Sequence, residues 1–205
     1  MRRYETLETL FGKVDLSFAE NVLNEITGWK SSQVRDLGYR LHLAVDVKSE
    51  LPVAMIAASA NENEKKHSLR LFERASTHVK PRKLLADPQY SSQSLRDAAL
   101  RKGTLPVIPI PKNQMKRAKG ILRIDRKFKS HGPQTLRKAY KNRAAVERVF
   151  SRLTNLAGLT QHNLRGLAKI TFHAQLCLLI MLFTAEAAVN TRQTSKIRSI
   201  RYFAN

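Results

Sequence analysis

The sequence predicts an α/β protein in which helices flank a mixed sheet. Residues 38–47 and 51–60 are two strand-like runs joined by three polar residues, a pattern typical of an antiparallel hairpin. Beyond this hairpin, helical patterns alternate with short apolar runs as far as residue 110. Such an order implies a mixed sheet with helices on its faces, and the ribonuclease-H-like arrangement is one such sheet.

The first helix after the hairpin is expected over residues 61–75. Asn61 can cap this helix, and Leu69 and Phe72 fall at helical spacing on one of its faces. Pro81 then interrupts the chain, and the short apolar run that follows it predicts a strand that leads into Asp87.

A second helix and an edge strand are expected next. Ser91 or Ser92 can cap the helix, and Gly103 ends it. Residues 105–110 read LPVIPI and predict a strand. Because proline donates no hydrogen bond to a neighbouring strand, this strand is expected at an edge of the sheet.

The remainder of the chain is basic at first and then strongly apolar. Residues 112–133 show little periodicity and are expected to form a basic loop or insertion. A helix is expected to begin near Thr135, and residues 164–189 predict one or two apolar helices. Residues 191–205 form a basic tail that is expected to fray.

The charge of the chain indicates the class of its partner. Lys and Arg number 37 against 16 Asp and Glu, which gives a formal net charge of +21. A charge of this size in 205 residues requires a polyanion, so DNA, RNA and an anionic membrane surface are the candidate partners.

The distribution of cysteine and of apolar residues excludes other classes. The single Cys177 excludes a disulfide framework and a cysteine-rich zinc site, and it is expected to be a buried, inert thiol. The most apolar run, residues 176–185, is shorter than the roughly 20 residues that span a bilayer. The N-terminus lacks the apolar core of a signal peptide. We therefore expect a cytoplasmic protein that is not bound to a membrane.

Two acids stand out as candidates for chemistry. Asp87 follows a predicted strand, at the end where α/β sheets place ligands. Glu147 is the only acid between Asp125 and Glu186. It is either paired with a neighbouring arginine or placed to bind a metal ion, and the pattern alone leaves both readings open.

Glu147 belongs to a polar row at helical spacing. Tyr140, Arg143, Glu147, Ser151 and Thr154 are separated by three, four, four and three residues, so they share one face of a single helix. Carboxylates that hold divalent metals and a guanidinium that steadies phosphate oxygens are the groups that phosphodiester chemistry needs. An ordinary solvated helix face produces the same row.

Four segments resemble the catalytic domain of bacterial and archaeal insertion-sequence transposases with an Asp-Asp-Glu (DDE) triad. They are residues 38–60, LLADPQYSS at 84–92, VIPIPKNQ at 107–114, and Y-x-x-R-x-x-x-E at 140–147. The resemblance implies a ribonuclease-H-like fold and two Mg²⁺ or Mn²⁺ ions. It also implies cleavage of DNA at the ends of the element, joining of the freed 3′-OH to target DNA, and a homo-oligomer when the protein acts on DNA.

The resemblance also assigns residues. Asp87 matches the second acid of the triad, and Tyr90 matches the aromatic residue that follows it. Glu147 matches the third acid, with Tyr140 and Arg143 as its companions. We expect all three acids of the triad to bind metal.

The first acid has three candidates. Asp15 in KVDLS fits best, on a strand that should lie beside the strand ending at Asp87. Asp46 on the hairpin and Asp36 in a turn are the alternatives. The family pattern places a Lys seven residues after the Glu, where this chain has Thr154.

Basic residues on and around the predicted insertion are the candidate DNA contacts, since Lys and Arg that neutralise phosphates release counterions. Arg148 or Arg152 could replace the missing Lys at the DNA ends. The full set of expected DNA contacts is Lys112, Lys116, Arg117, Lys119, Arg126, Lys127, Lys141, Arg148 and Arg152.

These observations predict a metal-dependent DNA transposase catalytic domain over residues 1–190, followed by the basic tail at 191–205. A DNA-binding region ahead of this domain is expected to be missing, so the chain is expected to be a truncated copy. The alternatives are a catalytically inactive, basic nucleic-acid-binding remnant and a small basic protein of membrane surfaces or ribosomes.

Overall fold

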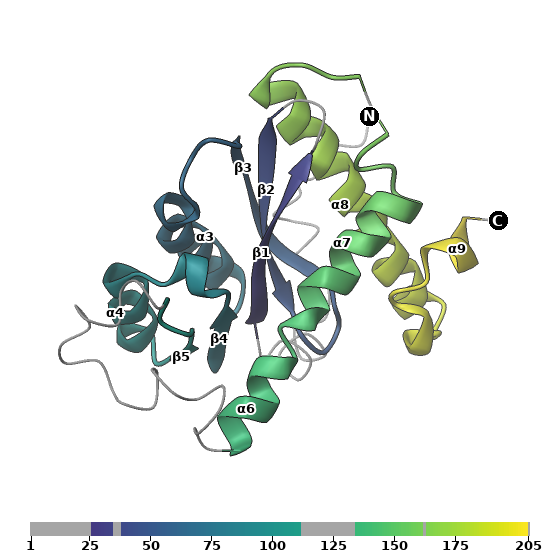
Figure 1. Cartoon of the computed structure of the whole chain (residues 1–205). Coiled ribbons are helices and arrows are strands. Elements are labelled where there is room, and N and C mark those ends of the chain that lie inside the picture. Colours follow the sequence, from purple (N-terminus) through teal and green to yellow (C-terminus); the bar gives the residue numbers. More distant parts are fainter. Residues whose placement is uncertain (1–25, 35–37, 112–133, 162, 205) are drawn as a thin grey trace, which may run out of the picture.

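A five-stranded mixed sheet forms the centre of the molecule, in the order β3-β2-β1-β4-β5 (Figure 1). The structure is a computed structural model and describes residues 26–34, 38–111, 134–161 and 163–204. Strands β1, β2 and β3 are antiparallel neighbours, whereas β4 and β5 run parallel to β1. The strands are β1 (Ile26–Val34), β2 (Tyr39–Asp46), β3 (Pro52–Ser59), β4 (Lys83–Ala86) and β5 (Leu105–Val107). The predicted α/β class and its ribonuclease-H-like mixed sheet are confirmed.

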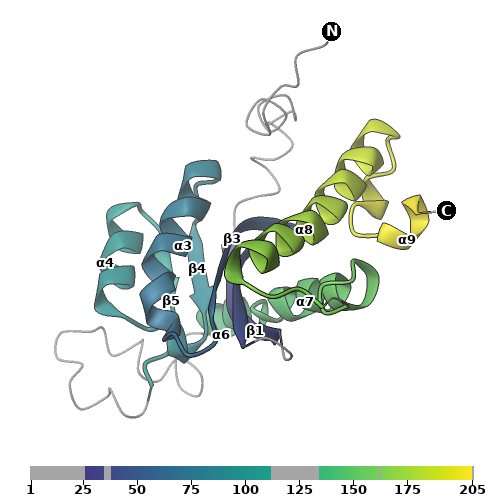
Figure 2. The ribbon, with the colours of Figure 1, turned by 90° about the horizontal axis from the view of Figure 1, so that it is seen from above.

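Helices cover both faces of this sheet, as the view from above shows (Figure 2). One layer holds α3 (Glu64–His78) and α4 (Gln93–Arg101). The other holds α7 (Ala144–Leu156) and α8 (Leu167–Asn190), with α6 (Gln134–Lys141) leading into α7. The short elements are η1 (Pro88–Tyr90), η3 (Thr194–Lys196) and α9 (Ile200–Phe203).

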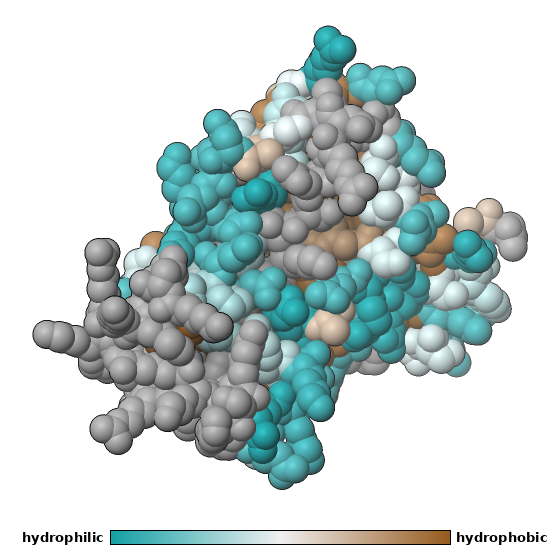
Figure 3. Space-filling model, in the orientation of Figure 1, coloured by the Kyte–Doolittle hydropathy of each residue, from teal (hydrophilic) through white to brown (hydrophobic). Residues whose placement is uncertain are grey.

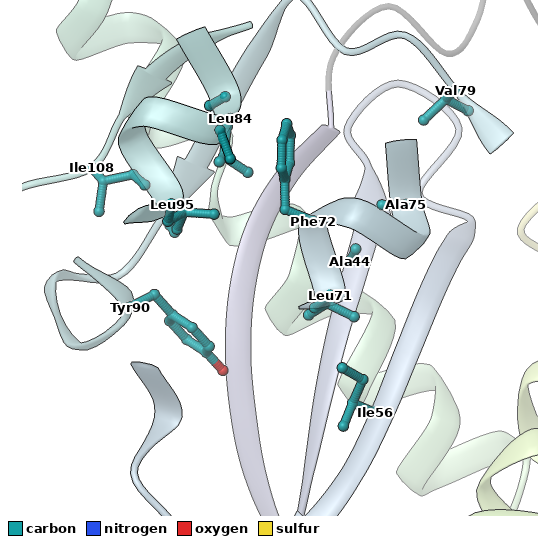
Figure 4. Packing of buried hydrophobic residues seen from close by; sticks show 13 residues of the cluster. Ala44, Ile56, Leu71, Phe72, Ala75, Val79, Leu84, Tyr90, Leu95 and Ile108 are labelled. Atoms are coloured by element: carbon teal, nitrogen blue, oxygen red, sulfur yellow. The ribbon is translucent and has the colours of Figure 1, made fainter. Parts of the chain in front are cut away.

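Strand β2 supplies both cores, because its side chains alternate between the two faces. Leu41, Leu43 and Val45 pack with α7 and α8. Ala44 packs on the opposite face with Phe72 of α3 and other apolar residues (Figure 4). The sequence pattern of the hairpin therefore fixes which helices lie on which side.

Several boundaries agree with the sequence pattern and one does not. Ser92 caps α4 by accepting a hydrogen bond from the Leu95 amide at 3.3 Å, as expected. β5 is an edge strand, as its prolines predict. The cap of α3 is Asn63 rather than Asn61, because the Asn63 side chain accepts the Lys65 amide hydrogen at 3.0 Å.

The central strand β1 was not predicted. Its Ile26 and Trp29 pair with Leu84 and Ala86 of β4, so β1 fills the position expected for the strand carrying Asp15. Asp15 lies outside the described residues, and so does the predicted strand that carries it. The β1 sequence, ITGWKSSQV, has no apolar run by which a strand could be recognised.

The C-terminal part departs from expectation at residues 191–205. The described residues 191–204 form η3 and α9 rather than a frayed tail, and Ile200 is buried in the core beside α7 and α8. The apolar region at residues 164–189 forms one long helix, α8, which agrees with the prediction of one or two helices. By length and composition α8 could cross a membrane, but 39% of its most apolar window is buried against the rest of the chain.

Candidate active site

Asp87 is placed by the alternation of β4. Leu84 and Ala86 point into the core beneath α3 and α4. Leu85 points to the opposite face, where it packs with Leu136 and Tyr140 of α6. Asp87 follows Ala86, so its carboxylate emerges on the face of the sheet that carries α6 and α7.

Arg143 joins the two conspicuous acids. Its Nη1 lies 2.9 Å from Asp87 Oδ1 and 3.5 Å from Glu147 Oε1. Because the same nitrogen lies close to both oxygens, the distance between Asp87 Oδ1 and Glu147 Oε1 cannot exceed the sum of these two distances. Carboxylates more than about 10 Å apart would be too far apart to share a two-metal site, so this pair is close enough. The structure therefore brings Asp87 and Glu147 into one partly exposed site, with Arg143 between them.

The junction between α6 and α7 sets the position of Arg143. The amides of Asn142 and Arg143 donate to the carbonyls of Ala139 and Tyr140, three residues back. Such bonds tighten the backbone into 3₁₀ geometry. Tyr140 therefore lies on α6, and Glu147 lies in the first turn of α7, where the helix dipole favours a carboxylate. The prediction of one continuous helix face from Tyr140 to Thr154 is wrong, since two helices share the row.

Tyr140 supports the guanidinium rather than acting as a base. The Arg143 guanidinium carbon lies 5.7 Å from the centre of the Tyr140 ring. Burial, aided by the charge of Asp87, raises the pKa of Tyr140 to about 12, although Arg143 opposes the shift. The phenol therefore keeps its proton at neutral pH and can act as a hydrogen-bond donor.

Asp46, one alternative for the first acid, does not reach this site. Its Oδ2 accepts hydrogen bonds from the amide and the hydroxyl of Ser49, both at 2.7 Å, and burial raises its pKa. Asp46 pairs with Ile26, which itself pairs with Leu84. At about 4.8 Å per strand and 3.3 Å per residue, it lies more than roughly 10 Å from Asp87. Its carboxylate holds the hairpin turn. Asp36, the other alternative, lies outside the described residues.

A comparison with family models identifies the family of the chain. Residues 15–183 match the family model described as "Transposase DDE domain". The chain belongs to the transposase DDE domain family. No curated protein matches.

Among solved structures, two similar ones are retroviral. The catalytic core domain of BIV integrase has a TM-score of 0.49 and 13% identity, covering 78% of this chain and 83% of that one. A simian T-cell lymphotropic virus intasome, in complex with the PP2A regulatory subunit B56 gamma, has a TM-score of 0.39 and 18% identity. It covers 77% of this chain and 48% of that one.

The donors of the DDE domain suit the metals that the family implies. Mg²⁺ is bound in proteins by one or two carboxylates together with waters and substrate phosphates, and Mn²⁺ also prefers oxygen ligands. Asp87 and Glu147 supply two such carboxylates on one side of the sheet. Within the described residues no three His, Cys, Asp or Glu side chains are grouped to hold a metal.

Two of the expected DNA contacts of the DDE domain have a partner within the chain. Arg148 Nε lies 2.6 Å from Glu50 Oε1, and Arg152 Nη2 lies 2.7 Å from Glu50 Oε2. Arg198 also reaches Oε1, at 3.3 Å. Burial opposes ionisation of Glu50, but the hydrogen bonds from Arg152 and Arg148 outweigh it and lower the pKa. We term Glu50 and these three arginines the Glu50 cluster. No sequence signal pointed to Glu50.

The other expected DNA contacts divide between exposed and undescribed positions. Lys141 is exposed at the end of α6, two residues before Arg143. The space-filling view shows a hydrophilic surface over α6 and much of α7 (Figure 3). Outside the described residues lie Lys112, Lys116, Arg117, Lys119, Arg126 and Lys127.

Tyr90, the aromatic residue after the second acid, is a core residue. Its hydroxyl lies 2.9 Å from Nδ1 of the buried His42. Burial, followed by the neighbouring His67, lowers the pKa of His42 from 6.5 to about 4. Tyr90 thus anchors the η1 turn that follows Asp87. His42 is a packing histidine.

Proposed function

We propose that this chain binds DNA and carries out divalent-metal-dependent DNA strand cleavage and strand transfer in transposition. The observation that supports the proposal best is the meeting of Asp87 and Glu147 around Arg143. These acids come from different elements and lie 60 residues apart in the sequence, yet the fold brings them to one site. A solvated helix face would not bring Asp87 to Glu147.

The proposed chemistry divides among the residues of the site. Asp87 and Glu147 would hold the metal ions, with Asp15 as the proposed third ligand. When bound, such ions supply an activated water and neutralise charge on the leaving oxygen. Arg143 would hold the scissile phosphate with its guanidinium. Tyr140 would position that guanidinium, which lies over its ring, and would donate a hydrogen bond to a phosphate oxygen.

DNA would approach over α6 and α7. Lys141 is exposed two residues before Arg143, and the net charge of +21 supplies a long-range attraction for the phosphate backbone. We propose that the undescribed basic residues of 112–133 add further phosphate contacts. We propose that the protein is located in the cytoplasm, where it would have access to its DNA substrate.

Metal binding by matched variants tests the proposal. Titration calorimetry with Mn²⁺ should show binding to the wild type that weakens at least tenfold in Asp87→Asn and in Glu147→Gln. Asp97→Asn is the control, because Asp97 lies on α4 and pairs with Gln93 at 2.8 Å on the other side of the sheet. The same four proteins are then assayed for nicking of supercoiled DNA. Equal Mn²⁺ affinity in all four, or DNA binding without metal-dependent nicking, would contradict the proposed function.

A further inference from the structure

Helix α8 is apolar on two faces. One face is buried against the sheet and α7, and it includes Ala174, Cys177 and Met181. The opposite face carries large apolar side chains that no described residue covers. Their exposed fractions are 62% for Phe172, 45% for Leu176, 40% for Ile180 and 54% for Phe183. Figure 2 shows α8 beside α7 on one side of the sheet.

One row of side chains on the uncovered face has the spacing of a coiled-coil seam. Successive intervals of three, four, three, four and three residues separate the members of this row, and none of them is buried. The row includes the half-buried Leu179, and the exposed Ile180 lies beside it. Alternation of three and four is the heptad pattern by which one helix packs against another. At 1.5 Å per residue the seam is about 25 Å long. We term this set the α8 seam: Lys169, Phe172, Leu176, Leu179, Phe183 and Glu186.

The α8 seam reads alike in both directions apart from its terminal charges. We propose that it docks a second copy of this chain, with the two α8 helices packed antiparallel. A two-fold axis between Cys177 and Leu178 would place Phe172 opposite Phe183 of the partner subunit, and Leu176 opposite the partner's Leu179.

The charges at the ends of the seam select this direction. In the antiparallel pair Lys169 meets Glu186 of the partner subunit at both ends. In a parallel pair Lys169 would meet its own copy, and so would Glu186, which places like charges together. A membrane surface fits less well, because interfacial helices carry many Lys and Arg beside the apolar face. Lys169 and Glu186 are the only charged residues of α8.

The area of the seam suits a weak dimer. Four of its members are Phe or Leu; an aromatic side chain buries about 150–250 Å² when fully covered, and roughly half of that is free for these four. Each copy thus offers at most roughly 300–500 Å², or about 600–1,000 Å² in total, which is the size of a weak interface. Because each copy carries +21, salt should strengthen the dimer by screening, whereas it weakens DNA binding.

Sedimentation equilibrium of the whole chain tests the proposal. The protein concentration should range over about 5–200 µM, so that it brackets a dissociation constant on the order of micromolar. The wild type should show a monomer–dimer equilibrium that tightens between low and high salt. Leu176→Glu should raise the dissociation constant at least tenfold. Leu100→Gln is the control, because Leu100 is 58% exposed on α4, away from the seam. Unchanged circular dichroism verifies the fold of each variant.

Two further experiments test whether the two α8 helices pack antiparallel and whether a second copy of the chain covers the seam. Lys169→Glu should weaken the dimer several-fold, and addition of Glu186→Lys in the same chain should restore it. A mixture of Phe172→Cys and Phe183→Cys chains should form a mixed disulfide, whereas Phe172→Cys alone should not. A monomeric wild type, a dimer that Leu176→Glu leaves intact, or self-linking of Phe172→Cys would overturn the proposal. So would a monomeric chain that binds neutral phosphatidylcholine vesicles through Leu176.

The dimer does not rest on the acid pair. Glu147→Gln should therefore dimerise like the wild type even where it abolishes Mn²⁺ binding, so failure of either proposal can be recognised separately.

Discussion

Replacement of Glu50 by Gln should destabilise the fold more than any other single change from a carboxylate to an amide among the described residues. The Glu50 side chain is only 5% exposed, and three guanidinium groups surround it. Gln keeps the shape but removes the charge, so the arginines lose their shared counter-ion while they stay in place.

The expected loss follows from how deeply each arginine is buried. Breaking a buried ion pair costs about 3–5 kcal/mol, whereas an exposed pair contributes less than about 1 kcal/mol. Arg152 is 18% exposed, but Arg148 and Arg198 are about half exposed, at 52% and 48%. We therefore expect the free energy of unfolding to fall by about 3 kcal/mol, with most of the loss from Arg152.

Urea unfolding at pH 7 measures this loss. Glu73→Gln is the matched control, since Glu73 is exposed on α3, and it should change stability by less than about 0.5 kcal/mol. The folded state lowers the pKa of Glu50 below 4.5, so its contribution is complete above about pH 4.5 and is lost as pH falls through the folded value. Equal unfolding curves for the two variants at pH 7 would refute the reasoning.

Three other outcomes are expected. Arg143→Ala should lower DNA nicking by about 100-fold, because the phosphate loses its guanidinium. The variant should bind Mn²⁺ more tightly in calorimetry, because the two carboxylates lose a competing positive charge. Unchanged nicking would show that Arg143 takes no part in the reaction. Burial and the neighbouring His67 lower the pKa of His42 to about 4, so between pH 6.5 and about 4 the unfolded chain takes up a proton that the folded chain does not, and stability falls. His42→Gln should reduce this fall, which urea midpoints at several pH values measure. Parallel pH profiles for the variant and the wild type would contradict the prediction. Cys177 should react with a thiol reagent only as the protein unfolds, because burial raises its pKa and hides the sulfur; rapid labelling of the folded chain would contradict this burial.

Local patterns predicted the elements whose signals lie close together in the chain. The hairpin, the cap at Ser92 and the placement of Asp87 after β4 each follow from a few neighbouring residues. β1 escaped prediction because its position depends on pairing with β2 and β4 rather than on an apolar run of its own. The break between α6 and α7 has no glycine or proline to announce it.

The candidate site was predicted in part for the same reason. The motifs identified Asp87, Arg143 and Glu147, and the fold brings them together. The motifs could not show that Arg148 and Arg152 turn to Glu50, because that carboxylate lies about a hundred positions away in the sequence and only the folded sheet brings it to α7. Whether these arginines also reach DNA stays a prediction.

The Glu50 cluster also limits when the chain can fold. Glu50 is made early, in the turn after β2, but its partners are made much later, and Arg198 follows the whole of α8. Ile200, which completes the same core, is made later still. A nascent chain that has not reached these residues has an incomplete core and an incomplete counter-ion shell. Contacts this distant in sequence slow folding, so the final packing of α7, α8 and the hairpin is a late step.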